Sequence, residues 1–96
     1  MHKAIKLLLK IPKGKVATYK EMARACNTSP RAIGRIMAGN TDPVTYPCYK
    51  VVASNGALTG YSGHGGLLGK KKLLENEGIK ITKGKVDKKY FYKLKN

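Results

Sequence analysis

Two short helices with explicit start signals constrain the fold of this chain more than any other feature. The segment "TYKE", which begins at Thr18, fits a capping box in which Glu21 stands three residues after the cap. Ser29 then fits the cap of a second helix, with Pro30 at its first position and Gly39 at its end. Two short helices joined by a turn of three or four residues form a helix-turn-helix.

The 3.6-residue period divides the second helix into two faces. Ile33, Ile36 and Met37 share one face and are predicted to pack inward. The opposite face sets two arginines among residues with almost no side chain, namely Arg31, Gly34, Arg35 and Ala38. Bare backbone beside arginine suits close approach to a nucleic-acid groove, and an ordinary exposed helix face is the alternative.

Charge and composition narrow the class of protein. A chain of 96 residues with 42% hydrophobic residues suits one domain with one modest core. Twenty Lys and Arg against five Asp and Glu give a net charge of +15, which favours a polyanion such as nucleic acid over a merely solvated surface. The apolar run near the start contains a lysine and no cleavage site, so we expect neither a signal peptide nor a membrane span. Two cysteines without zinc-site spacing predict no metal site and reduced thiols inside a cell.

The remaining segments predict a mainly α fold with a small β-hairpin. Residues 3–11 have helical spacing, residues 49–53 are predicted as a strand, and "SNG" at 54–56 predicts a tight turn. A last helix is predicted in "LLGKKKLLENEG", with Gly78 at its end and with Leu67, Leu73 and Leu74 facing inward. The basic tail, residues 80–96, is expected to add a small hairpin or to lie along a partner.

Cys48, in "TYPCYKVV", is either a small apolar filler or a reactive thiol. Buried structural cysteines are common, whereas a reactive cysteine needs positive neighbours or a helix N-terminus. Lys50 and the general basic field supply positive charge. An ordinary thiol is only a few per cent ionised at neutral pH, however, and no histidine stands beside this one. Both interpretations stay open on the residues alone.

The run "NTDPVTYPCYKVVASNGALTGYSG", with "ATYKEMA" and "SPRAIGRIMAGN" before it and "LLENEG" after it, resembles the O6-alkylguanine-DNA alkyltransferases. The likeness is to their DNA-binding active domain and covers about residues 3–79, with several motifs in the same order and at similar spacing. It implies a winged-helix-like helix-turn-helix domain over residues 1–79, followed by a basic C-terminal extension over 80–96.

This resemblance implies DNA repair by direct alkyl transfer. Members of the family bind double-stranded DNA containing O6-alkylguanine through the minor groove and flip the damaged base into a pocket. A cysteine thiolate then takes the alkyl group, so that the protein is a single-turnover methylated-DNA–protein-cysteine methyltransferase that needs no cofactor. We expect a monomer with no membrane association, in the cytoplasm or in the nucleus of a eukaryote.

Motif by motif, the resemblance assigns roles to individual residues. Cys48 is the alkyl acceptor, Asn40 braces its turn, and Glu77 ends a proton relay. Tyr19 helps to turn out the nucleotide, and Arg31 fills the vacated stack. Small residues let the helix approach the groove closely, and an arginine one turn away compensates for the groove-facing arginine that this chain lacks. Backbone carbonyls accept the guanine amine, and a loop forms the pocket. These roles fall, in this order, to Ala32 and Gly34; Arg35, in place of Ala38; Cys48 and Val51; and Tyr61, Ser62 and Gly63.

The chain departs from the family where the family motif reads Pro-Cys-His-Arg-Val. Tyr49 replaces the histidine that passes a proton between thiol and glutamate, and a phenol is a poor base at neutral pH. Its hydroxyl could still relay a proton through water toward Glu77, or the phenol could ionise in the basic field. Lys50 replaces the arginine, and the pocket loop is longer and contains His64, a possible substitute base. The alternatives are therefore a non-catalytic alkyltransferase-like lesion binder, although those proteins lack the cysteine, and a plain helix-turn-helix DNA binder.

Overall fold

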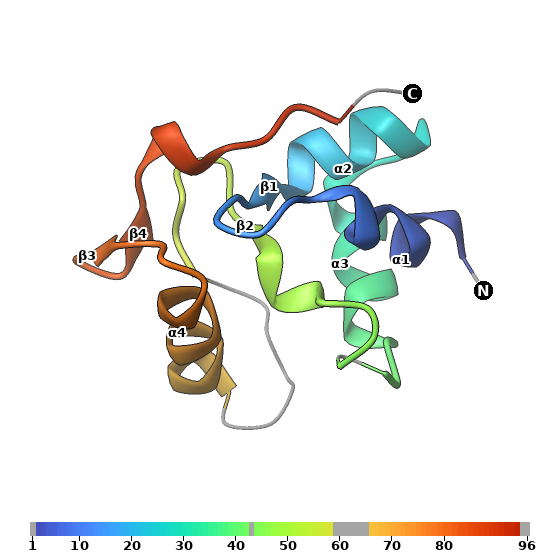
Figure 1. Cartoon of the computed structure of the whole chain (residues 1–96). Helices are drawn as coiled ribbons and strands as arrows, with labels where there is room; N and C mark the ends of the chain where they lie inside the picture. The colour runs from blue at the N-terminus through green and yellow to red at the C-terminus, as the bar shows by residue number, and fades with distance from the viewer. Residues whose placement is uncertain (1, 43, 59–65, 95–96) are drawn as a thin grey trace.

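The computed structural model describes residues 2–42, 44–58 and 66–94, and these residues form a mostly helical fold with two small sheets (Figure 1). This confirms the expected fold class. No helix in these ranges is long and apolar enough to cross a membrane. The elements, in chain order, are α1 (Lys3–Leu7), a 3-10 turn (Leu8–Lys10), β1 (Ala17–Thr18), α2 (Tyr19–Cys26), α3 (Pro30–Ala38), a 3-10 turn (Cys48–Lys50), β2 (Val51–Val52), α4 (Gly66–Asn76), β3 (Ile81–Thr82), β4 (Lys85–Val86) and a 3-10 turn (Lys88–Tyr90).

The helix-turn-helix is present with the predicted caps. The Thr18 hydroxyl accepts a hydrogen bond from the Glu21 N–H at 3.0 Å, and the Ser29 hydroxyl accepts one from the Ala32 N–H at 3.1 Å. Asn27 adopts the left-handed conformation (φ 56°) at the end of α2, which turns the chain toward α3. These short-range signals define where both helices begin and where the first one ends.

The two faces of α3 lie as the helical period predicts. Ile33 and Met37 are buried against α1 and α2, and Ile36 packs at the edge of the same core. Arg31 and Arg35 are exposed on the opposite side. Each fully buried aliphatic side chain contributes about 1.5–3 kcal/mol relative to exposure. The arginine face is therefore presented to solvent by burial of the isoleucine and methionine face.

The strand expected over residues 49–53 is shorter than predicted, and it pairs with an earlier strand of the chain. Cys48–Lys50 form a 3-10 turn, and only Val51–Val52 are strand. This strand, β2, pairs in parallel with β1, so that Ala17 lies opposite Val51. Both valines are fully buried, which favours pairing with the equally buried β1. The pairing brings the start of α2 beside the turn that carries Cys48.

The predicted tight turn after β2 is confirmed, and it contacts the C-terminal hairpin. The Gly56 N–H donates to the Ala53 carbonyl at 2.8 Å, with Gly56 at φ +87°. β3 and β4 form an antiparallel hairpin, which confirms one of the two expectations for the tail. The Val86 N–H donates to the Gly56 carbonyl at 2.8 Å, so this hairpin is hydrogen-bonded to the turn.

The last residues of the tail run across the N-terminal half of the molecule. Val16 donates to Tyr90 at 2.8 Å and accepts from Tyr92 at 2.7 Å through backbone groups. Leu94 is buried in the core, and its N–H donates to the Glu21 carboxylate at 2.6 Å. Glu21, the predicted capping-box acid, thus joins the tail to α2. The boundary expected at residue 79 stays a prediction, and each of two core clusters contains residues from both sides of it.

Helix α4 differs from its predicted orientation. Leu74 is fully buried as expected, but Leu73 is 37% exposed, and Lys70 occupies the buried position one helical turn before Leu74. Residues four apart share a helix face, so the inward face of α4 runs through Lys70 and Leu74 and leaves Leu73 at its side. Gly78 ends the helical segment at φ +87°, as predicted. The side chain of Leu67 lies outside the described part of the chain.

Replacing Gly56 by alanine should destabilise the protein. A Cβ at this position would overlap the Val86 carbonyl oxygen, and the positive φ adds backbone strain. We expect the free energy of unfolding, measured by urea denaturation, to fall by about 2 kcal/mol or more. Gly34→Ala is the control, because nothing lies within 4 Å of the added atom. Equal stability of the two variants would contradict this description of the turn.

Candidate active site and nucleic-acid interface

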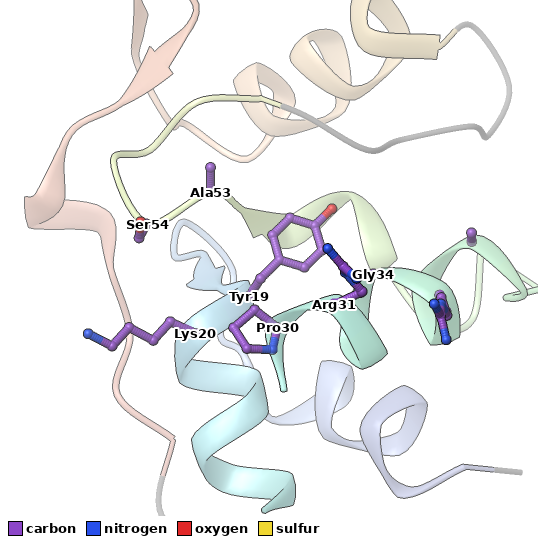
Figure 2. Close-up of a pocket in the computed structure, with 9 residues that line it drawn as sticks. Tyr19, Lys20, Pro30, Arg31, Gly34, Ala53 and Ser54 are labelled. Carbon is purple, nitrogen blue, oxygen red and sulfur yellow. The ribbon is translucent and has the colours of Figure 1, made fainter. Parts of the chain in front are cut away.

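A groove of about 890 Å³ lies between the helix-turn-helix and the turn after β2 (Figure 2). Small residues of α3 form its floor, and basic side chains border it. This is the arrangement expected from the outward face of α3. The residues that line the groove are Tyr19, Lys20, Pro30, Arg31, Gly34, Arg35, Ala38, Ala53 and Ser54.

Tyr19 links this groove to the cysteine. It is the first residue of α2, and its ring projects between α3 and the segment at Ala53 (Figure 2). Burial raises the pKa of the Tyr19 hydroxyl, and negative charge at Cys48 raises this pKa further. The phenol is therefore a protonated hydrogen-bond donor at neutral pH, close enough to the thiol to interact electrostatically with it.

Asn40 organises the loop that leads to the cysteine. Its amide donates to the Tyr46 carbonyl at 2.8 Å, and its side-chain oxygen accepts from the Asp42 N–H at 3.1 Å. The Cys48 N–H donates to the same Tyr46 carbonyl at 2.8 Å. Asn40 thus lies where a brace for the Cys48 turn would act, and its functional role stays a prediction.

Cys48 is largely covered rather than openly exposed. It is a free cysteine with 7% of its surface accessible, and it belongs to the core cluster against which Tyr19 and Tyr46 pack. Its surroundings are not purely aliphatic, because Tyr19 and Lys70 both interact with its charge.

Lys70 is the residue that the sequence analysis missed. It has no exposed surface, and its ammonium donates to the Val51 carbonyl at 2.6 Å and lies 6.0 Å from the centre of the Tyr19 ring. Burial lowers the pKa of Lys70 to about 8, while negative charge at Cys48 acts in the opposite direction. Within the run of three lysines only the four-residue spacing to Leu74 could have indicated that this one faces inward.

Glu77 is bound by three donors from two segments, the N-terminal loop and the turn that carries Cys48. Its carboxylate accepts from the Tyr49 hydroxyl, from the Gly14 N–H at 3.1 Å and from the Lys50 ammonium at 3.1 Å. Burial raises the pKa of Glu77, but the hydrogen bonds from Tyr49, Gly14 and Lys50, together with the charge of Lys50, outweigh it and lower the pKa overall. Tyr49 therefore meets Glu77 directly, as a neutral donor to a carboxylate.

Lys50 was expected to supply positive charge to the thiol, but its ammonium binds other groups. It is 3% exposed, and its ammonium donates to the carbonyls of Ile11 at 2.9 Å and Pro12 at 2.8 Å as well as binding Glu77. These contacts hold the end of the first helical segment. For Lys70, negative charge at Cys48 raises the pKa against the larger effect of burial.

For the other residues assigned to the site, the structure gives less evidence of a role. Val51 is buried, and the carbonyl expected to accept the guanine amine is bound to Lys70. Ala32 is half-buried and lies outside the set that lines the groove, so its contact with DNA stays a prediction. Among the described residues no group of three His, Cys, Asp or Glu could hold a metal ion. Four loop residues lie outside the described ranges: Tyr61, Ser62, Gly63 and His64.

Comparison with known proteins identifies the family to which this chain is related. The sequence profile of the family described as "6-O-methylguanine DNA methyltransferase, DNA binding domain" matches residues 1–79. The chain belongs to this family. The methylated-DNA–protein-cysteine methyltransferase of Pyrobaculum aerophilum is 50% identical over 76 residues, which are 79% of this chain and 50% of that protein. The protein of the same name from Saccharolobus solfataricus is 47% identical over 76 residues, 79% of this chain and 48% of that protein.

Solved structures give the same result for the fold. S. pombe Atl1, in complex with damaged DNA containing O6-carboxymethylguanine, superposes with a TM-score of 0.82 at 28% identity over 96% of this chain and 93% of that chain. Mycobacterium tuberculosis OGT in complex with DNA superposes with a TM-score of 0.72 at 36% identity over 78% of this chain and 47% of that chain. The chain spans about half the length of the curated relatives that it matches.

Burial of Lys70 should make stability depend on pH in the alkaline range. The unfolded lysine keeps its proton up to about 10.5, whereas the folded one loses it near 8, so between these values the unfolded state binds more protons and stability rises with pH. Relative to Lys70→Met, the free energy of unfolding of the native protein should rise by up to about 3 kcal/mol across this window. Lys71→Met, on the exposed side of the same helix, controls for the loss of one charge. A constant difference between the native protein and Lys70→Met would contradict the burial of a charged ammonium.

Proposed function

We propose that this protein repairs DNA by transferring the alkyl group of O6-alkylguanine to Cys48, in a single turnover and as a monomer. The Cys48 thiolate attacks the alkyl carbon, the bond between this carbon and guanine O6 breaks, and its electron pair leaves with the guanine, which takes up a proton. The products are S-alkylcysteine and unmodified guanine. The observation that carries the proposal is a cysteine that interacts electrostatically with a buried ammonium and a protonated phenol, next to a groove lined by arginines.

Binding of double-stranded DNA is supported by the groove. Arg31 and Arg35 are exposed on the outward face of α3, and Gly34 between them leaves open space in which a Cβ would meet nothing within 4 Å. Such a face admits close approach of a nucleic-acid backbone with positive charge on both sides. The damaged base must leave the stack to reach the thiol, because its reacting atom is inaccessible inside the duplex.

Activation of the thiol is assigned to Lys70 rather than to Tyr49. A buried cation favours the ionised form of a nearby thiol, and the weak screening around a residue with no exposed surface strengthens this effect. Tyr49 already donates to Glu77, and ionisation of this phenol beside a carboxylate would place two negative charges together. Tyr19 is the candidate donor to the guanine, because its raised pKa keeps it protonated.

A second candidate is binding of the lesion without transfer. It is favoured by the likeness to S. pombe Atl1, which covers 96% of this chain, including part of the segment beyond residue 79. Burial of Cys48 and replacement of the expected histidine by Tyr49 point in the same direction. The presence of the cysteine and the 50% identity to a methyltransferase favour transfer.

Mass spectrometry of the peptide that contains Cys48 separates the two candidates. After incubation with a duplex containing O6-methylguanine, transfer predicts the gain of one methyl group on this peptide and none on the peptide that contains Cys26. Cys48→Ala should abolish the gain and retain DNA binding. An unmodified peptide from a protein that binds the lesion tightly would establish the second candidate, and binding without preference for the lesion would contradict both.

A further inference from the structure

We infer that the DNA-binding surface continues beyond the α3 groove, across the turn after β2, onto Lys85 and Lys88, which lie outside the family match. The partner is the phosphate backbone of the same DNA duplex. This inference rests on the proposed binding of double-stranded DNA and adds a contact that residues 1–79 do not contain. It assigns to the basic tail a position beside the groove and a function in binding phosphate.

A second hollow lies next to the groove. It has a volume of about 390 Å³ and is lined by Asn55, Thr82, Lys85, Val86, Asp87 and Lys88. Ser54 lines the groove at α3, and Asn55, the next residue in the chain, lines the second hollow. Lys20 and Ser54 lie at the same end of the groove (Figure 2). A strand of DNA leaving the groove at this end would therefore meet the lysine pair.

The lysine pair is held in a defined position by backbone contacts. Ala57 bridges Lys85, the Val86 N–H donates to the Gly56 carbonyl at 2.8 Å, and Gly56 has no room for a side chain against Val86. The turn and the hairpin thus form one unit. Cations on a preorganised surface lose less conformational freedom on binding than cations on a loose tail.

The charge of this hollow is positive although it contains a carboxylate. Asp87 lines it beside the two lysines, and its side chain accepts from the Lys89 N–H at 2.9 Å, where it caps the last 3-10 turn. Lys85 and Lys88 are exposed. A polyanion can therefore pair with both ammonium groups while Asp87 remains bound to the backbone.

The salt dependence of DNA binding tests this surface directly. Each phosphate contact contributes about −0.9 to the slope of log K against log salt concentration. We expect Lys85→Gln/Lys88→Gln to reduce the magnitude of the slope by about 2 for an unmodified duplex, measured by fluorescence anisotropy. Between 50 and 200 mM salt, the native protein should then lose roughly ten-fold more affinity than this variant.

The control is Lys6→Gln/Lys10→Gln, which removes the same charge from exposed positions of the first helical segment. α1 packs on α2 and α3 and lies far from the β3–β4 hairpin (Figure 1). The control should keep the native slope. Equal slopes for the native protein and the Lys85/Lys88 variant would overturn this inference while leaving the proposed function intact. Failure of the native protein to bind the duplex would overturn the proposed function itself.

Discussion

The carboxylate of Glu77 holds together the parts of the molecule that form the thiol site. It accepts from Gly14 in the N-terminal loop and from Tyr49 and Lys50 in the cysteine turn, while Glu77 itself follows α4. A buried carboxylate is costly without such donors, and with them it stabilises the ionised form. Removal of this group would take one charged partner from the buried Lys50 ammonium.

This contact fixes the helix that carries Lys70. With the end of α4 bound to the cysteine turn, the inward face of the helix brings Lys70 to the Val51 carbonyl and beside Tyr19 and Cys48. The two buried lysines thus have separate tasks. Lys50 neutralises Glu77, and we propose that Lys70 favours the thiolate.

Local signals predicted the helix-turn-helix closely. The signals that start the two helices involve residues close together in the sequence, namely Thr18, Ser29 and Pro30. The helical period of the apolar residues Ile33 and Met37 determines which face of α3 is buried. The parallel pairing of β1 with β2 depends on contacts between residues more than thirty positions apart, which no local pattern encodes. For the same reason the tail could be assigned a hairpin but not its place against Gly56 and Val16.

The site was predicted in part, and the missing part is informative. Asn40 binds the loop before Cys48 and Tyr49 contacts Glu77, with their roles still predictions, whereas the burial of Lys70 was not anticipated. Lysine is almost never fully buried without a partner, so a basic helix reads as a solvated surface. Leu73 was placed inward by its apolar character, although α4 turns a lysine toward the thiol instead.

The rate of methyl transfer to Cys48 from a duplex containing O6-methylguanine tests the central claim most directly. It is measured under single-turnover conditions by mass spectrometry of the peptide that contains Cys48. Lys70→Met should slow the transfer markedly, whereas Tyr49→Phe should leave the rate nearly unchanged. If Tyr49→Phe abolishes the transfer and Lys70→Met preserves it, activation by the buried lysine is contradicted.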